Sequence, residues 1–316
     1  MRSLKIIVLF LFLVLFSCPA LSKTKTIGLG SEEVKVSGYI QALYSSTQPD
    51  ISSFSVARLR VDIWGDPNPI WGYLIEIDPT VSTSLIYGWV DIKSIPWFKL
   101  RVGKFYYPFG LEYSTPPSNF DTINPSNTLW KFFGFSRDIG AELLGGSNGF
   151  KYYLAVVNGN DNQGKDNNNF KDFCGRATYN FGDLTAGASV YSGLTGTDEA
   201  RDRGRTGAEL NYKNGLFSLK GEFISGLEET PDTVIRSQGW YVMPIVRFAG
   251  SFEALVKYEI YDPDVNSNID ANSYITYGIN YFFTEDLKLQ INYVRDIEEE
   301  EQIKDDTFAA QLQLSF

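Results

Sequence analysis

The sequence predicts an all-β membrane protein, a transmembrane antiparallel up-and-down β-barrel of about sixteen strands. Three observations predict it. Apolar and polar residues alternate with period two through most of the chain after residue 30. The connections between the alternating segments switch between short turns and long loops. The third long connection, residues 105–136, is so aromatic that we expect it to fold inward and pack inside the barrel.

The composition is consistent with this class and excludes several others. The 316-residue chain has a formal net charge of −10, no histidine and only two cysteines, and 15% of its residues are aromatic. Without histidine, a Ser-His-Asp hydrolase and a histidine-ligated metal site are both impossible. Two cysteines, Cys18 and Cys174, are too few for a zinc cluster or a disulfide framework. We therefore expect no cofactor, no catalytic activity and no nucleic-acid partner.

The first 22 residues have the features of a secretory signal peptide. Arg2 and Lys5 precede an unbroken apolar run, residues 6–16, and small residues follow it. The run is too short to span a bilayer, which takes about 20 residues. Cleavage after Ser22 fits this pattern; lipidation at Cys18 and a retained interfacial anchor are the alternatives. We expect residues 23–316 to form one barrel domain in the bacterial outer membrane.

Sixteen alternating segments follow the signal peptide. In residues 287–293, for example, one face is wholly apolar and the other wholly polar. Most of the segments have the length of about 9–11 residues that a tilted membrane-spanning strand requires. We predict strands over residues 33–45, 54–65, 70–78, 85–93, 97–104, 137–145, 150–158, 170–181, 184–193, 204–212, 216–226, 238–248, 251–261, 272–283, 287–296 and 306–316.

The connections predict how these strands are arranged. Short turns alternate with longer loops, which is the plan of an outer-membrane barrel with periplasmic turns and extracellular loops. An open sheet edge would leave unpaired amides in lipid, so the strands must close, and a barrel of this size encloses an aqueous channel. A soluble sandwich or propeller is the alternative, but it does not produce this rhythm. We expect residues 66–69 and 284–286 in the periplasm, and we expect five stretches outside: 159–169, 194–203, 227–237, 262–271 and 297–305.

The acidic charge of the chain lies mainly at the predicted outer rim. Without the signal peptide the chain has 26 basic and 38 acidic residues. The seven long loops other than 105–136 hold 17 of the acids and five of the bases. At ~0.15 M ionic strength the screening length is about 8 Å, so rim charges act weakly on a constriction inside the barrel. We expect the rim to contact lipopolysaccharide through divalent cations, and we expect the lumen wall to set ion selectivity.

Strand alternation directs the charged side chains into the lumen, where they face water or one another. Because most of the bases near the expected constriction are arginines, which stay charged and bind oxyanions well, we predict a weak preference for anions. The pore-lining bases that we expect to attract anions are Arg58, Arg60, Lys99, Arg101, Lys131 and Arg137. The acids of the connection 105–136, which we expect to form the constriction, are Glu112 and Asp121.

An ordered set of short motifs resembles the phosphate-selective porin (porin O and P) family. The motifs run through most of the chain after the signal peptide and include Arg101–Phe105, Pro108–Glu112, Ser136–Gly140, Val157–Gly159, Gly207–Leu210, Gly239–Val242 and Gly278–Tyr281. The resemblance implies a trimeric, sixteen-stranded outer-membrane barrel. It also implies a channel that draws anions along lumen arginines toward a lysine cluster at the constriction.

The chain departs from that family at the constriction. The loop 105–136 has one base, Lys131, and no lysine cluster. The sequence therefore predicts a passive diffusion channel for small hydrophilic solutes with weak anion preference, and phosphate is one permeant among the possible anions. The main alternative is a structural or adhesive surface protein that acts through its acidic loops. An outer-membrane enzyme is disfavoured because the usual histidine base is missing.

Overall fold

The computed structural model describes residues 25–29, 32–47, 51–134, 136–160, 166, 168–196, 201–267, 270–297 and 306–316. The predicted signal peptide, residues 1–22, lies outside the described residues, and so does Cys18. Cleavage after Ser22 and lipidation at Cys18 therefore both stay predictions. Among the described residues, no helix is long and apolar enough to cross a membrane.

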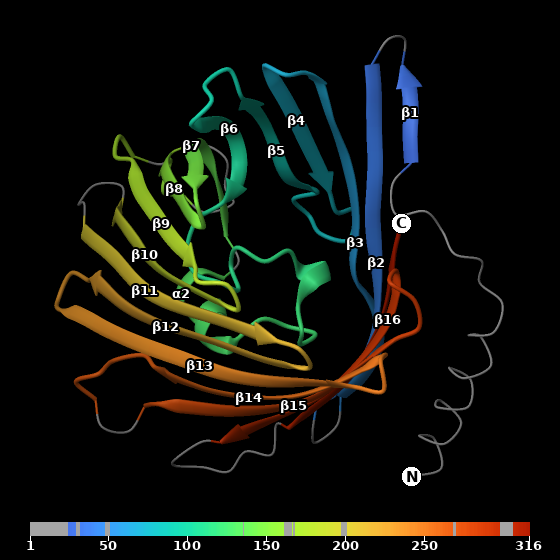
Figure 1. Ribbon diagram of the computed structural model, residues 1–316. Coiled ribbons are helices and arrows are strands. Elements are labelled where there is room, and N and C mark those ends of the chain that lie inside the picture. The colour runs from blue at the N-terminus through green and yellow to red at the C-terminus, as the bar shows by residue number, and fades with distance from the viewer. Residues whose placement is uncertain are drawn as a thin grey trace.

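Sixteen strands form one closed antiparallel barrel (Figure 1), which confirms the predicted fold class. Each strand pairs with the next in sequence, and the last pairs with β2, where Thr307 lies opposite Thr47 and closes the ring. The strands are β2 (Glu32–Thr47), β3 (Ile51–Asn68), β4 (Trp71–Ile77), β5 (Leu85–Ile92), β6 (Phe98–Tyr106), β7 (Arg137–Ser147), β8 (Phe150–Val157), β9 (Asp172–Asn180), β10 (Leu184–Thr195), β11 (Arg201–Asn214), β12 (Phe217–Glu229), β13 (Val234–Phe248), β14 (Phe252–Asp262), β15 (Asn272–Phe282), β16 (Leu287–Ile297) and β17 (Thr307–Ser315).

The barrel buries polar side chains and exposes apolar ones, as a membrane barrel must. On β16, Gln290 and Asn292 are buried in the lumen, whereas Tyr293 is exposed on the outside. Large apolar side chains such as Val102 and Ile279 are about half exposed on the outer surface. In water this arrangement would be unstable. In a membrane, lipid solvates the apolar outer face, and the polar groups of the lumen are hydrated or paired with one another.

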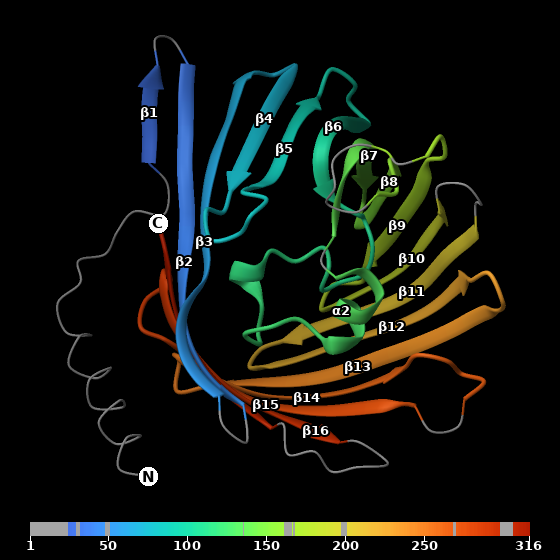
Figure 2. The same ribbon diagram turned by 180° about the vertical axis from the view of Figure 1, so that it is seen from behind.

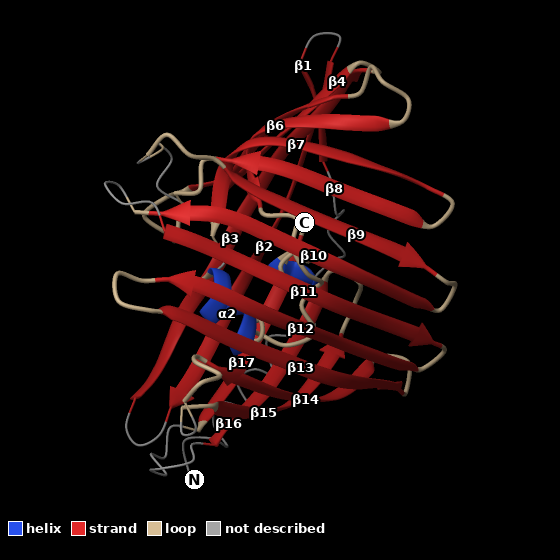
Figure 3. Ribbon diagram, turned by 90° about the vertical axis from the view of Figure 1, so that its left-hand side faces the viewer, coloured by secondary structure: helices blue, strands red, loops and turns tan. Residues whose placement is uncertain are grey.

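The connections lie at two opposite ends of the barrel (Figure 3). The turns at one end are short, and the C-terminus lies at that end, as predicted. Several strands are longer than predicted; β13, for example, begins at Val234 rather than near residue 238. The ends of these strands extend beyond the segment that contacts lipid. Because apolar and polar residues need to alternate only where a strand contacts lipid, the period-two pattern cannot locate the strand ends. The structure also has β1 (Lys25–Leu29), which pairs with the start of β2 and is absent from the predicted set.

The connection between β6 and β7 folds into the barrel, as the sequence predicts. Figures 1 and 2 show it inside the ring of strands, with a short 3-10 helix, η2 (Pro117–Asn119), and the helix α2 (Asn127–Phe133). The Ser126 side chain caps α2 by accepting a hydrogen bond from the Leu129 amide at 3.2 Å. Gly134 ends the helix in the left-handed conformation that glycine adopts without strain.

The aromatic side chains of this connection form the largest apolar cluster of the lumen. Tyr107, Phe109 and Tyr113 are almost completely buried and pack with Phe133 of α2. The cluster also contacts the barrel wall, where Tyr191 of β10 packs edge-on against Tyr107. Burying these rings removes a large apolar area from water and holds the connection in place. Hereafter we call residues 107–136 the constriction loop.

Candidate permeation site

The constriction loop is hydrogen-bonded along one side of the lumen, which we call the sealed wall (the inward side chains of β12 and β14–β17). Glu259 accepts from the backbone amide of Asn127 at 2.8 Å and from its side-chain amide at 3.1 Å. Asn292 accepts from the amide of Ile123 at 2.8 Å. Four further side chains of this wall donate to loop carbonyl groups, namely those of Asn280, Lys288, Gln290 and Gln313. The wall thereby satisfies loop backbone groups that would otherwise be buried without partners.

One glycine sets how closely the loop can approach this wall. Gly110 has φ of +59°, and a Cβ atom there would lie 1.7 Å from Oε1 of Glu222. The neighbouring Glu112 amide donates to Oε2 of the same carboxylate at 3.2 Å. A side chain at position 110 would therefore be strained by its backbone conformation and would also push the loop off Glu222.

On the long-loop side of the constriction loop lies a cavity of about 480 Å³, the outer chamber. Three arginines line it, Arg58 and Arg60 from β3 and Arg137 from the start of β7. Among the described residues that line it, none has a carboxylate. The loop faces these arginines with uncharged groups, the side chains of Asn124, Asn127 and Trp130 among them. The outer chamber therefore has a basic wall and a neutral loop face.

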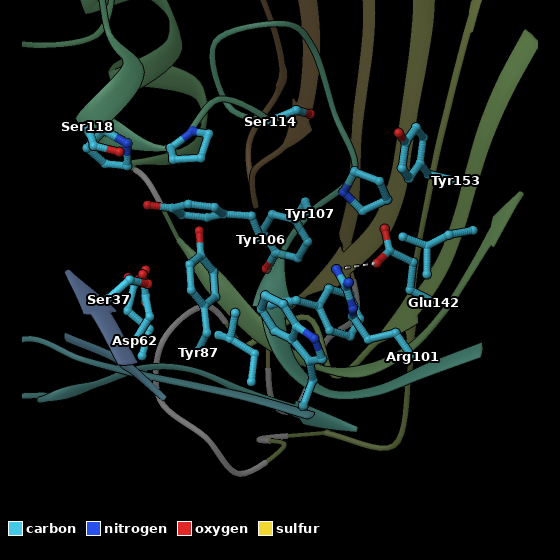
Figure 4. Close-up of a pocket in the computed structure, with 18 of the residues that line it drawn as sticks. Ser37, Asp62, Tyr87, Arg101, Tyr106, Tyr107, Ser114, Ser118, Glu142 and Tyr153 are labelled. Atoms are coloured by element: carbon cyan, nitrogen blue, oxygen red, sulfur yellow. Dashed lines mark hydrogen bonds and ion pairs between the residues drawn. The ribbon is translucent and has the colours of Figure 1, made fainter. Parts of the chain in front are cut away.

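A second cavity of about 590 Å³, the inner chamber, lies toward the short-turn end, where Ser37 and Phe316 line it. Its wall is densely aromatic and more acidic than that of the outer chamber (Figure 4). The charged residues among its lining are Asp62, Glu76, Glu142, Arg101 and Arg176. We call the side of the lumen that faces both chambers, from β2 to β8, the open wall.

Tyr106 and Pro117 line both chambers, so the passage between the chambers runs past these two residues. Tyr106 stands at the end of β6, and its hydroxyl accepts a hydrogen bond from Nη2 of Arg137 at 2.5 Å. The guanidinium of Arg137 also lies over the Tyr106 ring, 4.4 Å from its centroid. These contacts hold the arginine and the ring together at the narrow point.

Most charges of the open wall are paired, but Arg58 is not. Arg60 binds Glu76 at 2.5 Å and Asp78 at 3.2 Å. Within the described part of the chain, Arg58 has no carboxylate partner, and its guanidinium donates to Oε1 of Gln41 at 2.8 Å. Burial raises the pKa of Asp78, which follows β4, but hydrogen bonds from Thr80 and the charge of Arg60 outweigh it, so this pKa lies below its usual value.

The family model for Gram-negative porins matches residues 11–301. The chain belongs to the Gram-negative porins. A comparison with curated proteins found no match. The inward loop and the two chambers on either side of it are therefore the channel of a porin, and this porin is an outer-membrane protein.

Solved porin structures share the fold of this porin at low sequence identity. Outer-membrane OmpT of Vibrio cholerae is 12% identical, with a TM-score of 0.72 over 92% of this chain and 100% of that one. An anion-selective porin from Comamonas acidovorans is 14% identical, with a TM-score of 0.70 over 90% of this chain and 99% of that one. The channel DcaP of Acinetobacter baumannii is 11% identical, with a TM-score of 0.68 over 90% and 97%. At these identities the likeness concerns the fold alone.

Four of the six bases that the sequence singles out line a chamber of this porin. Arg58, Arg60 and Arg137 line the outer chamber and Arg101 lines the inner one. Arg101 lies 4.0 Å from the centroid of the Trp89 ring and is paired with Asp91 and Glu142. Lys99 also binds Asp91, at 2.8 Å, and lies outside both chamber linings. Their expected effect on anions remains a prediction.

The structure places the three charged residues of the loop away from the chambers. Lys131 is exposed on α2 and lines neither chamber. Glu112 is buried and accepts a hydrogen bond from the Ser126 amide at 2.7 Å. Asp121 binds Lys220 of β12 at 2.6 Å. The two acids therefore lie between the loop and the sealed wall.

Uncharged side chains that the sequence does not single out also organise the channel. Gln41 is fully buried and links three parts, because it accepts from Arg58 and donates to Gln313 and to the Pro117 carbonyl. Gln290 and Asn292 likewise occupy polar positions of an alternating strand. The sequence contains a signal for these residues, because amide side chains occupy inward positions that on other strands carry charged side chains. Alternation alone does not show which groups they contact.

Proposed function

We propose that this outer-membrane diffusion channel admits small hydrophilic solutes with a weak preference for anions. The observation that carries the proposal is the outer chamber, where the described lining next to the constriction has three arginines and no carboxylate. Membership of the porin family favours a channel over an enzyme, and cavities on both sides of the loop favour it over an adhesive surface protein.

The preference follows from the position of the charges rather than from the net charge. The charge of Arg58 is not offset by any described carboxylate, because its guanidinium donates to the neutral Gln41 side chain, and it lies on a low-dielectric wall. A wall of this kind concentrates the field in the pore, whereas the acidic rim is screened within about 8 Å at ~0.15 M salt. Since Arg60 is neutralised by Glu76 and Asp78, we expect the preference to be weak.

We propose that the channel has no tight phosphate site, although its motifs resemble those of phosphate-selective porins. A tight site would need several uncompensated bases at the narrow point. The loop contributes Lys131 alone, which is exposed and outside the chamber linings. Chloride current should therefore persist in micromolar phosphate, and strong block at that concentration would contradict this part of the proposal.

Reversal potentials in a KCl gradient test the anion preference. The purified porin in planar bilayers should give a small reversal potential of the anion-selective sign. The triple variant Arg58→Ala/Arg60→Ala/Arg101→Ala should move it toward cations, and Lys213→Gln, an exposed charge at the short-turn end, should leave it unchanged. A wild-type channel that is strongly cation-selective would overturn the proposal. Liposomes that do not swell in any small solute would favour the adhesive alternative.

We propose that the porin assembles as a homotrimer through the β2–β4 side of the barrel. β3 pairs with β4 only as far as Val61, so its segment 51–60 has β2 as its single neighbour. Phe54 and Val56 on this segment are 70% and 47% exposed. A V. cholerae OmpT structure of the same fold is described as a trimer form. Unheated gel migration and native mass spectrometry should show three chains, and Phe54→Asp should weaken the assembly.

We also propose that the export signal is cleaved and that the acidic rim contacts lipopolysaccharide through divalent cations. The intact mass of the protein from outer membranes should correspond to a chain that begins at residue 23. A lipid-modified chain beginning at Cys18 would show the alternative. Chelation of divalent cations should release bound lipopolysaccharide from the purified porin if the rim is the contact.

A further inference from the structure

The charge of the open wall reverses along a single strand. Arg58, Arg60 and Asp62 occupy successive inward positions of β3, where they pair across to Gln41, Tyr39 and Ser37 of β2. Arg58 lines the outer chamber and Asp62 lines the inner one, so the reversal coincides with the passage between the chambers. The positive and negative ends are therefore ordered along the pore rather than across it.

The two ends of this series lack described partners of opposite charge. Arg60, in the middle, is paired with Glu76 and Asp78. Asp62 has no cationic partner among the described residues; its carboxyl group is hydrogen-bonded to that of Glu76, and its Oδ1 atom is buried without a partner there. The hydroxyl of Tyr39, a residue that is 5% exposed and lines the same chamber, also has no partner in the described structure. The inner chamber is therefore bordered by the acidic pair Asp62 and Glu76, and the outer chamber by a guanidinium without a described carboxylate partner.

Strand geometry gives the separation of these ends. At about 3.3 Å per residue, the Cα atoms of residues 58 and 62 lie about 13 Å apart along β3. The Arg58 and Asp62 side chains can shorten this span. An extended tripeptide has a length of about 10 Å, at about 3.3–3.6 Å per residue. Its carboxylate and ammonium groups therefore match the two ends in sign, order and approximate distance.

We propose that the two chambers form one binding site for extended zwitterionic solutes of short-peptide length. The carboxylate lies against Arg58 in the outer chamber, and the ammonium group lies near the acidic pair Asp62 and Glu76 in the inner chamber. Tyr106 and Pro117 flank the middle of the solute, where an uncharged backbone fits between them. This inference deepens the proposed function, because it names a solute class for the same channel.

Triglycine and its two blocked forms provide a matched test. Triglycine is a zwitterion, N-acetyl-triglycine is an anion and triglycine amide is a cation, and their sizes are similar. Their block of ion current through the reconstituted porin should be compared at low salt, where screening is weak. Triglycine should block at the lowest concentration. Equal or stronger block by N-acetyl-triglycine would overturn the proposal and leave only an anion site.

Substitutions of Arg58 and Asp62 distinguish a failure of the proposed peptide site from a failure of the proposed channel function. Arg58→Gln should weaken block by triglycine and N-acetyl-triglycine but not by triglycine amide. Asp62→Asn should weaken block by triglycine and triglycine amide only. Lys213→Gln and Asp232→Asn remove exposed charges elsewhere and should change none of the three. Unchanged triglycine block in Asp62→Asn would overturn the inference, whereas a wild-type protein without conductance would overturn the proposed function instead.

Discussion

The two walls of the lumen carry similar kinds of polar residue and use them differently. On the sealed wall, Glu259, Lys288 and Asn292 are hydrogen-bonded to the constriction loop. On the open wall, Arg58 and Asp62 line the two chambers and have no ion-pair partner within the described residues. A charge on the sealed wall contributes to loop stability, whereas a charge on the open wall contributes to the field that a solute meets.

This difference shows why counting lumen charges does not give selectivity. The sealed wall includes Glu222 and Glu259, which would make a channel cation-selective if solutes reached them. The loop covers both and donates to them through the backbone amides of Glu112 and Asn127 and the side-chain amide of Asn127. Selectivity therefore depends on which side chains the loop leaves uncovered.

The largest effect is expected from deleting most of the constriction loop, which covers the carboxylates of the sealed wall. Deleting residues 113–130 should raise single-channel conductance several-fold, because the loop fills much of the lumen while strand pairing holds the barrel. It should also move the reversal potential toward cations, since Glu222 and Glu259 become accessible. Conductance, reversal potential and heat-modifiable gel migration check this together. A well-inserted variant with unchanged conductance would show that the loop does not restrict the pore.

The next effect concerns the attachment of the loop to the sealed wall. Glu259→Ala should leave the backbone and side-chain amides of Asn127 without their acceptor, at a cost of about 1–3 kcal/mol for each buried unsatisfied group. Glu259→Gln keeps one carbonyl acceptor and serves as the control. Hydrogen exchange of residues 120–133 should be faster in the alanine variant than in the glutamine variant. Equal protection in both variants would mean that this contact does not hold the loop.

A smaller effect compares equal charge changes on the two walls. Arg58→Gln should shift the reversal potential measurably toward cations. Lys288→Gln removes the same charge, but Lys288 is buried against the carbonyls of Ser118 and Phe120, so the shift should be much smaller. Equal shifts in the two variants would contradict the division between an open and a sealed wall.

The smallest effect is expected at the passage between the chambers. Tyr106→Phe removes the hydroxyl that accepts from Arg137 but keeps the ring beneath the guanidinium. Conductance should stay close to that of the parent channel, with a slight change in reversal potential. Tyr106→Ala should widen the passage and raise conductance. If both variants conduct alike, Tyr106 does not border the narrow point.

The fold of this porin follows from local sequence features. Period-two alternation locates all sixteen barrel strands, because lipid and water impose opposite requirements on successive side chains. The alternation of loop lengths orders the strands, and the buried aromatic residues of the constriction loop predict that it packs inside. The capping residues of α2, Ser126 and Gly134, are visible in the sequence, although period-two alternation does not predict that helix.

The sequence alone determined that Arg58, Arg60 and Asp62 face the lumen, because side-chain direction depends only on position along a strand. It could not determine that Glu112 and Asp121 lie between the loop and the wall, or that Gln41 joins Arg58 to the loop. Those contacts connect residues far apart in the chain, such as Gln290 and Phe120, and they depend on where the loop comes to rest. The tertiary structure therefore decided which lumen charges solutes meet, because the loop makes most of its hydrogen bonds with the sealed wall and leaves the two chambers along the open wall.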